Sequence, residues 1–251
     1  MASGTTTRYT DGVSTIIQMS FLDSFGDALV LIARGDQEIW RVTAVSLHVS
    51  VLALLFGMLA GLPMGYAAAT TRHRVGNIAS WVFHTLTALP TVVVGLTLYF
   101  AFSAAGPLGW MDLLYTRTAM VVGQFILALP ILAAITLTTV KHLPAEAHET
   151  AITLGLTRAR RMQVLLMEAR PALMSGTLIA FARVFTELGA AVILGGNIRG
   201  QTRTLTTVIA LEYSKGDDAR AIAMGVILLV VALGINGTVH GAALPRTPKR
   251  P

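Results

Sequence analysis

Arg183 and Glu187 are the only charged residues in an otherwise apolar run from 172 to 193. A spacing of four places both on one face of a helix, where guanidinium and carboxylate can form an ion pair. An Arg at the centre of a membrane helix costs about 2.5–3.5 kcal/mol on insertion scales, so both side chains should face protein or water. Two interpretations stay open: a pathway or gate element that an anion meets, and a structural ion pair that fixes this helix to a neighbour.

A second candidate is the polar segment 141–170, which lies between two apolar runs. Glu149, Ala151 and Ile152 belong to a stretch that favours an amphipathic helix, and Gly155 after it tolerates the positive φ of a sharp turn. Three arginines follow the turn, at positions 158, 160 and 161. The segment is either a helix that seats in the groove of a partner protein or an ordinary amphipathic connector.

Motifs for catalysis are absent from the chain. No lysine follows a glycine, which excludes a P-loop, and no Gly-x-Ser-x-Gly sequence occurs. His148 and Glu149 begin a zinc-protease motif, but Ile152 stands where its second His must be. There is no Cys, which excludes thiol chemistry and disulfides. We therefore predict no catalytic residue, no metal site and no enzyme.

The composition predicts an all-α, polytopic membrane protein. Charged residues make up 13% of the chain, against about 25% in soluble domains, and hydrophobic residues make up 54%. Five apolar runs each approach or exceed the roughly 20 residues that cross a bilayer. These predicted spans are Val42–Ala69, Ile78–Phe102, Ala119–Val140, Ala172–Ile193 and Ala221–Val239.

The net charge of +6 is distributed as in a membrane protein, and we predict no nucleic-acid partner. If 141–170 is cytoplasmic, the inner segments hold ten basic and three acidic residues, and the outer segments hold eight and nine. This asymmetry places the N-terminus outside and the C-terminus inside. The polar first fifteen residues predict no cleaved signal peptide.

The chain divides into an extracytoplasmic segment, residues 1–39, a membrane domain, residues 40–245, and a cytoplasmic tail, residues 246–251. Residues 16–34 have helical periodicity and are expected to lie on the outer membrane surface, with a sixth span as the alternative. A short surface or re-entrant helix is expected between spans four and five. Pro90 and Pro130, each in an Ala-Leu-Pro sequence within a span, either kink their helices or are simply tolerated.

The segment 149–155 resembles the Glu-Ala-Ala-x-x-x-Gly loop by which permease subunits of ATP-binding-cassette (ABC) importers hold their ATPase partner. Glu149, Ala151 and Gly155 match that motif, whereas Thr150 replaces its second residue. The motif continues as Ile-x-Leu-Pro nine residues later, where this chain has Leu-Leu-Met-Glu at 165–168.

The resemblance extends over roughly residues 40–245. Segments 89–96, 106–109 and 128–131 look like permeases of the molybdate and tungstate importers, and segment 187–217 is similar to the tungstate branch. The count of five spans also favours that branch.

The resemblance implies a type I ABC importer permease that works as a homodimer in the bacterial inner membrane and carries an oxyanion, tungstate by preference. Two ATPase subunits would bind ATP and Mg and dock at 149–155, and an extracytoplasmic binding protein would deliver the anion. The alternatives are a molybdate or sulfate permease, a secondary anion carrier, and a membrane scaffold without transport.

A polar loop would then lie at the outer mouth of the pathway, where Arg, hydroxyl and backbone N–H groups hold a tetrahedral dianion well. Its candidate residues are Asn197, Arg199, Thr202 and Arg203. The same residues could instead dock the acidic rim of a binding protein or form a solvated loop.

Overall fold

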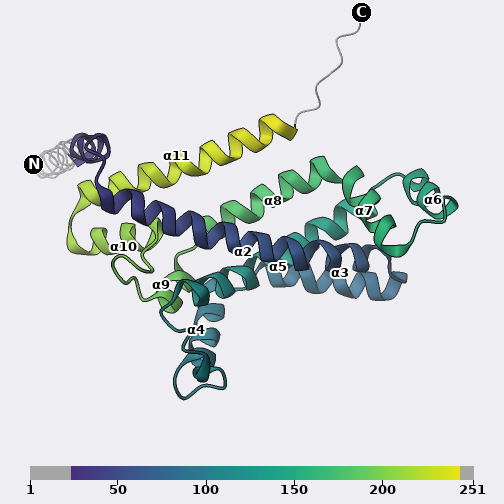
Figure 1. Ribbon diagram of the computed structural model, residues 1–251, viewed down its shortest axis with the longest axis horizontal. Helices are drawn as coiled ribbons and strands as arrows, with labels where there is room; N and C mark the ends of the chain where they lie inside the picture. Colours follow the sequence, from purple (N-terminus) through teal and green to yellow (C-terminus); the bar gives the residue numbers. More distant parts are fainter. Residues whose placement is uncertain (1–23, 244–251) are drawn as a thin grey trace, which may run out of the picture.

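A computed structural model describes residues 24–243, and in that range the regular elements are helices, with no strand. A helix Ser24–Ala33 comes first. The elements after it are α2 (Gln37–Thr70), α3 (His73–Thr87), α4 (Thr91–Phe102), the 3-10 turn η1 (Gly109–Met111), α5 (Arg117–Lys141), α6 (Ala145–Thr153), α7 (Arg158–Glu168), α8 (Arg170–Phe185), α9 (Gly189–Gly195), α10 (Leu205–Lys215) and α11 (Asp218–Ala243) (Figure 1).

The long helices confirm the predicted polytopic membrane fold. Within the described residues, α2, α5 and α11 are each long and apolar enough to cross a membrane. Two further candidates are bent pairs, α3 with α4 at 91° and α7 with α8 at 79°, which bring the total to as many as five. The segment 16–34, expected on the outer membrane surface with a sixth span as the alternative, is described only from residue 24, where it forms the short apolar helix Ser24–Ala33. Residues 16–23 and the tail 246–251 lie outside the described residues.

The second and fourth predicted spans are not the continuous helices that hydropathy suggested. The run 78–102 breaks between Thr87 and Thr91, and Pro90 becomes the N-cap of α4. Proline lacks an N–H and disfavours helical geometry in the residue before it, so the helix ends there. The run 172–193 divides into α8 and the short α9. Pro130, by contrast, lies within the uninterrupted α5.

Helices α2 and α5 lie side by side along the length of the molecule (Figure 1) and pack through small residues. Gly57, Gly61 and Gly65 recur at every fourth position of α2 and are buried. A Cβ at Gly65 would lie 2.4 Å from the carbonyl oxygen of Ala133 in α5, which leaves room for hydrogen alone. This small-residue spacing lets two helices approach closely in lipid.

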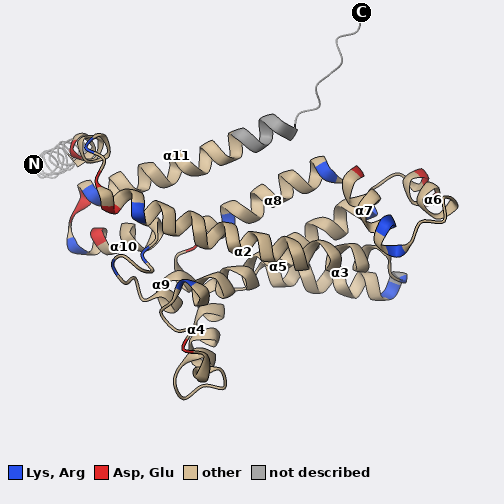
Figure 2. Cartoon of the chain, viewed as in Figure 1, with Lys and Arg blue, Asp and Glu red and all other residues tan. Residues whose placement is uncertain are grey.

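Charged side chains gather at the two ends of the molecule and are sparse between them (Figure 2). One end, here the α10 end, comprises α10, the loop 196–204 and the start of α2. The other, the α6 end, comprises α6, α7 and the end of α2. Helix α4 projects sideways from the body, away from both ends (Figure 1).

Candidate functional site

Helix α6 forms a short, exposed projection at the α6 end (Figure 1). It begins after Pro144 and ends at Thr153, and Gly155 then has φ +62°. A Cβ on Gly155 would meet nothing within 4 Å, so glycine is needed there for its backbone conformation and not for space. Ala151 is buried, whereas Glu149 and Ile152 face outward, which leaves an acidic and apolar surface available to a partner.

The predicted ion pair between Arg183 and Glu187 is present, with Nη1 and Oε2 2.9 Å apart. Glu187 lies just beyond the end of α8, and its side chain is 3% exposed. Its other carboxylate oxygen accepts from the backbone N–H of Ala190 at 3.3 Å, and its carbonyl oxygen accepts from Thr206 at 3.0 Å. The carboxylate is therefore fixed between α8 and α9 and the backbone of Glu187 is bonded to α10, while the Arg183 side chain stays 44% exposed.

The loop 196–204 brings the four predicted outer residues to the α10 end. Asn197 has φ +51°, and its Oδ1 accepts from the hydroxyl of Thr207 at 2.9 Å. Thr202 is buried; its hydroxyl accepts from the N–H of Ile198 at 3.0 Å and donates to the carbonyl of Gly195. Asn197 and Thr202 thus use hydrogen-bonding groups to shape the loop itself.

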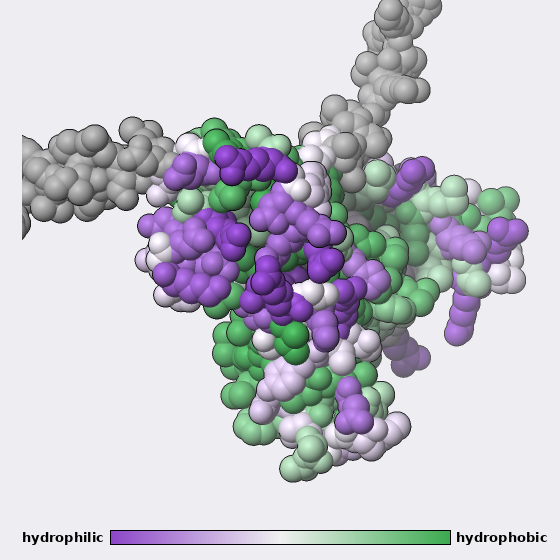
Figure 3. Space-filling model, turned by 60° about the vertical axis from the view of Figure 1, so that its left-hand side comes forward, coloured by the Kyte–Doolittle hydropathy of each residue, from purple (hydrophilic) through white to green (hydrophobic). Residues whose placement is uncertain are grey.

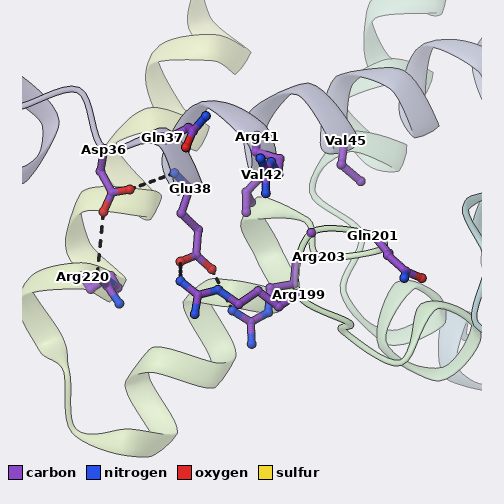
Figure 4. A pocket seen from close by; sticks show the side chains of 11 residues that line it. Asp36, Gln37, Glu38, Arg41, Val42, Val45, Arg199, Gln201, Arg203 and Arg220 are labelled. Atoms are coloured by element: carbon purple, nitrogen blue, oxygen red, sulfur yellow. Dashed lines mark hydrogen bonds and ion pairs between the residues drawn. The ribbon is translucent and has the colours of Figure 1, made fainter.

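Arg199 and Arg203 both bind Glu38, a residue that the sequence analysis did not single out. Glu38 lies between the two guanidinium groups, with Oε2 2.6 Å from Arg199 and Oε1 2.8 Å from Arg203 (Figure 4). Beside them, Arg220 lies 3.7 Å from Asp36. No local pattern could have revealed Glu38, because 161 and 165 positions separate it from its partners.

These pairs line a cavity of about 220 Å³ between the start of α2 and the loop 196–204. Hydrophilic residues cover this end of the molecule, and hydrophobic residues cover the part that projects below it (Figure 3). Within residues 24–243, no group of His, Asp and Glu could hold a metal ion. The α10 end therefore offers an ionic, hydrophilic surface (Figure 3).

Among the described residues, the body is all-helical with as many as five spans and polar ends, and these features define a multi-pass membrane protein. At one polar end it carries an exposed helix that is followed by a left-handed glycine. The chain belongs to the family described as the binding-protein-dependent transport system inner membrane component, whose model matches residues 53–240. The predicted resemblance is thereby confirmed, as is a multi-pass location in the inner membrane. The family is one of membrane subunits, which agrees with the prediction of a non-enzymatic chain.

Relatives match over most of their length. The chain is 33% identical to the "Tungstate uptake system permease protein TupB" of Peptoclostridium acidaminophilum, covering 87% of this chain and 96% of that protein. It is 34% identical to the protein of the same name from Campylobacter jejuni, over 87% and 91%. A "Probable anion ABC transporter permease protein" of Haloferax volcanii is 38% identical, over 88% and 98%.

A solved structure of a bacterial alginate ABC transporter in complex with a pentasaccharide-bound periplasmic protein has the same fold. Its TM-score is 0.71 at 17% sequence identity, covering 94% of this chain and 93% of that one. This likeness confirms the predicted permease fold.

Proposed function

We propose that this chain is the permease subunit of an ATP-driven importer that carries an oxyanion, tungstate by preference, into the cytoplasm. The observation that carries the proposal is identity of 33% and 34% to two tungstate uptake permeases along nearly their whole length. Molybdate or sulfate is the runner-up substrate. A secondary carrier would need no partner ATPase and thus no docking element like α6.

The proposed topology places the α6 end in the cytoplasm and the N-terminus outside. Ten basic residues of the inner segments against eight of the outer segments support it. The hydrophilic α10 end then faces the extracytoplasmic binding protein (Figure 3). Its exposed Arg199 is suited to the acidic rim of such a partner, or to the anion as it arrives.

Two ATPase subunits, which bind the ATP and Mg, would dock on α6 of two permease copies. Glu149 and Ile152 supply the exposed surface, and the turn at Gly155 fixes the direction in which α6 projects. When ATP draws the ATPases together, the two α6 helices approach and the outer side opens. Hydrolysis reverses the movement and releases the anion inward.

Helix α4 supports a homodimer. Its 12 residues reach about 18 Å, well short of the roughly 30 Å hydrocarbon core, so α4 does not span by itself. Val92, Val93 and Phe100 are more than half exposed, although α4 packs on α9 along another face. A second copy of the chain would cover this surface and enclose a pathway between the two subunits.

Arg183 is the proposed contact for the anion on that pathway. Its partner Glu187 is fixed by hydrogen bonds, and the guanidinium remains partly exposed within the apolar length of the molecule. A paired guanidinium keeps donors for a passing oxyanion without presenting a full positive charge that would trap it.

The direct test is uptake by cells with and without this gene, offered tungstate, molybdate and excess sulfate together and measured by mass spectrometry. Selective loss of tungstate on deletion is expected. Loss of molybdate as well would discard the narrow specificity, and no change in either anion would refute the oxyanion proposal.

The docking role is tested by Glu149→Arg, which reverses the charge of the exposed α6 surface. We expect loss of ATPase co-purification and of uptake, with normal membrane insertion. Asp218→Arg makes the same change from an acidic to a basic residue at an exposed position in the first turn of α11, at the α10 end, and should keep ATPase co-purification. Co-purification of the ATPase with Glu149→Arg at the wild-type level would exclude this role.

A further inference from the structure

A second polar cavity, of about 620 Å³, lies at the α6 end between the end of α2, helix α6 and the first turn of α7. Arg158 and Arg161 of α7 line it opposite Tyr66 of α2, and no carboxylate takes part in its lining. Its volume is in the range of small-molecule sites. The cavity is therefore a positively charged space that borders the proposed docking surface at Ile152 but contains neither Glu149 nor the proposed anion contact Arg183.

The two arginines in this cavity have no carboxylate partner among residues 24–243. Among the residues that the structure describes, neither Arg158 nor Arg161 forms an ion pair, and the Nε of Arg161 is buried without a hydrogen bond. A buried donor left without an acceptor costs about 1–3 kcal/mol. Arg160, between them in sequence, is instead exposed, bonds Gln163 at 3.3 Å and does not line the cavity.

The other polar side chains in the cavity have already used their hydrogen-bonding groups. The hydroxyls of Thr70 and Thr71 donate to backbone carbonyls of α2 at 3.0 and 2.6 Å. His148 lies 3.2 Å from the carbonyl of Val140. The donors left for a ligand are the two guanidinium groups and the phenol of Tyr66. The N-terminus of α7 also lies here, and the positive end of its helix dipole adds to the positive charge of the guanidinium groups.

We propose that this cavity binds a tetrahedral, phosphate-class oxyanion, either free or as the headgroup of a phospholipid. Such a group offers several charged oxygens, which guanidinium groups bind bidentately. The end of α2 is the end of a membrane span, so lipid headgroups and dissolved ions both reach it. A bound oxyanion would accept hydrogen bonds from the guanidinium groups of Arg158 and Arg161 and would connect α2 to α7, beside the proposed coupling helix.

The test uses the full-length chain, purified and stripped of lipid. Binding of inorganic phosphate and of tungstate is measured by equilibrium dialysis in detergent. Retention of phosphatidylglycerol against phosphatidylcholine is measured by mass spectrometry after reconstitution in nanodiscs. The variants are Arg158→Gln with Arg161→Gln, Tyr66→Phe, and the matched control Arg160→Gln.

The double variant should weaken binding at least ten-fold, Tyr66→Phe by a few-fold, and Arg160→Gln not at all. Saturable binding of the inorganic ions that the variants weaken in this order would identify a free oxyanion as the ligand. Selective retention of phosphatidylglycerol that the variants weaken in the same order would identify a phospholipid headgroup. Absence of both, or an equal loss in Arg160→Gln, overturns the proposal. Because the double variant removes no described contact, a thermal unfolding curve like that of the wild type would show that weaker binding reflects the site and not misfolding. The result is independent of which anion the permease carries, since these assays measure no transport.

Discussion

The two polar ends of the molecule use arginine in opposite ways. At the α10 end, Arg199 and Arg203 bind Glu38, and Arg220 lies near Asp36. At the α6 end, Arg158 and Arg161 line a cavity that no carboxylate enters. Arginine side chains thus form ion pairs within the chain at the α10 end, whereas at the α6 end they remain available to bind another molecule.

The difference comes from what each cluster faces. Glu38 and Asp36 begin the first long helix, and they neutralise arginines from the last third of the chain. The nearest acids to the α6-end arginines in sequence, Glu149 and Glu168, are both exposed, and neither lines the cavity. We infer that the α10 cluster mainly serves stability and the α6 cluster mainly serves binding.

The largest expected effect on stability is that of Glu38→Ala. It removes the shared acceptor of two guanidinium groups and leaves Arg203, whose side chain is 17% exposed, without its ion pair. We expect a loss of about 2 kcal/mol in the free energy of unfolding, because a partly buried charge is left unpaired. Unfolding of the purified protein in detergent measures it, and an unchanged curve would remove the distinction between the two ends.

Comparison of Arg203→Gln with Arg199→Gln tests, within the α10 cluster, whether burial decides how much each ion pair with Glu38 stabilises the protein. Both arginines bind Glu38, but the Arg199 side chain is 75% exposed. We expect about 1 kcal/mol for Arg203→Gln and less than about 0.5 kcal/mol for Arg199→Gln, since exposed ion pairs contribute little. Equal losses, measured in the same unfolding assay, would show that burial does not decide the contribution of each pair.

The smallest effect is expected at the opposite end. Arg158→Gln with Arg161→Gln should not lower the free energy of unfolding in the absence of ligand, because no ion pair is lost and a buried donor without an acceptor is removed. A loss above 1 kcal/mol in the unfolding assay would show that these arginines already stabilise the fold.

Hydropathy and local motifs predicted most of the helical fold. The runs at α2, α5 and α11 are long and nearly free of charge, so their helices follow from the cost of placing polar groups in lipid. Gly155 and the ion pair of Arg183 with Glu187 were likewise predictable, because each depends on residues close in sequence. The sequence also indicated Pro90 as a special position within its span.

Features that depend on the path of the chain could not be predicted in this way. Pro90 marks a break, but the 91° between α3 and α4 depends on what each half packs against. Hydropathy likewise could not show that the fourth run divides after Phe185, because the residues on both sides are apolar. The pairing of Glu38 with Arg199 and Arg203 requires the whole fold, since different helices carry the partners. Without knowledge of the Glu38 pairs, the sequence leaves three roles open for the loop arginines: contact with an anion, docking of a binding protein, and a solvated loop.

The glycines of α2 have a consequence for the order in which the protein is made. Helix α2 is synthesised before α5, and its glycine face has no partner until α5 follows. In lipid no hydrophobic force draws two helices together, so this contact forms only when the two backbones can touch. A chain arrested before α5 would therefore leave that face of α2 against lipid. The Glu38 pairs can close only later still, when the loop 196–204 has been synthesised.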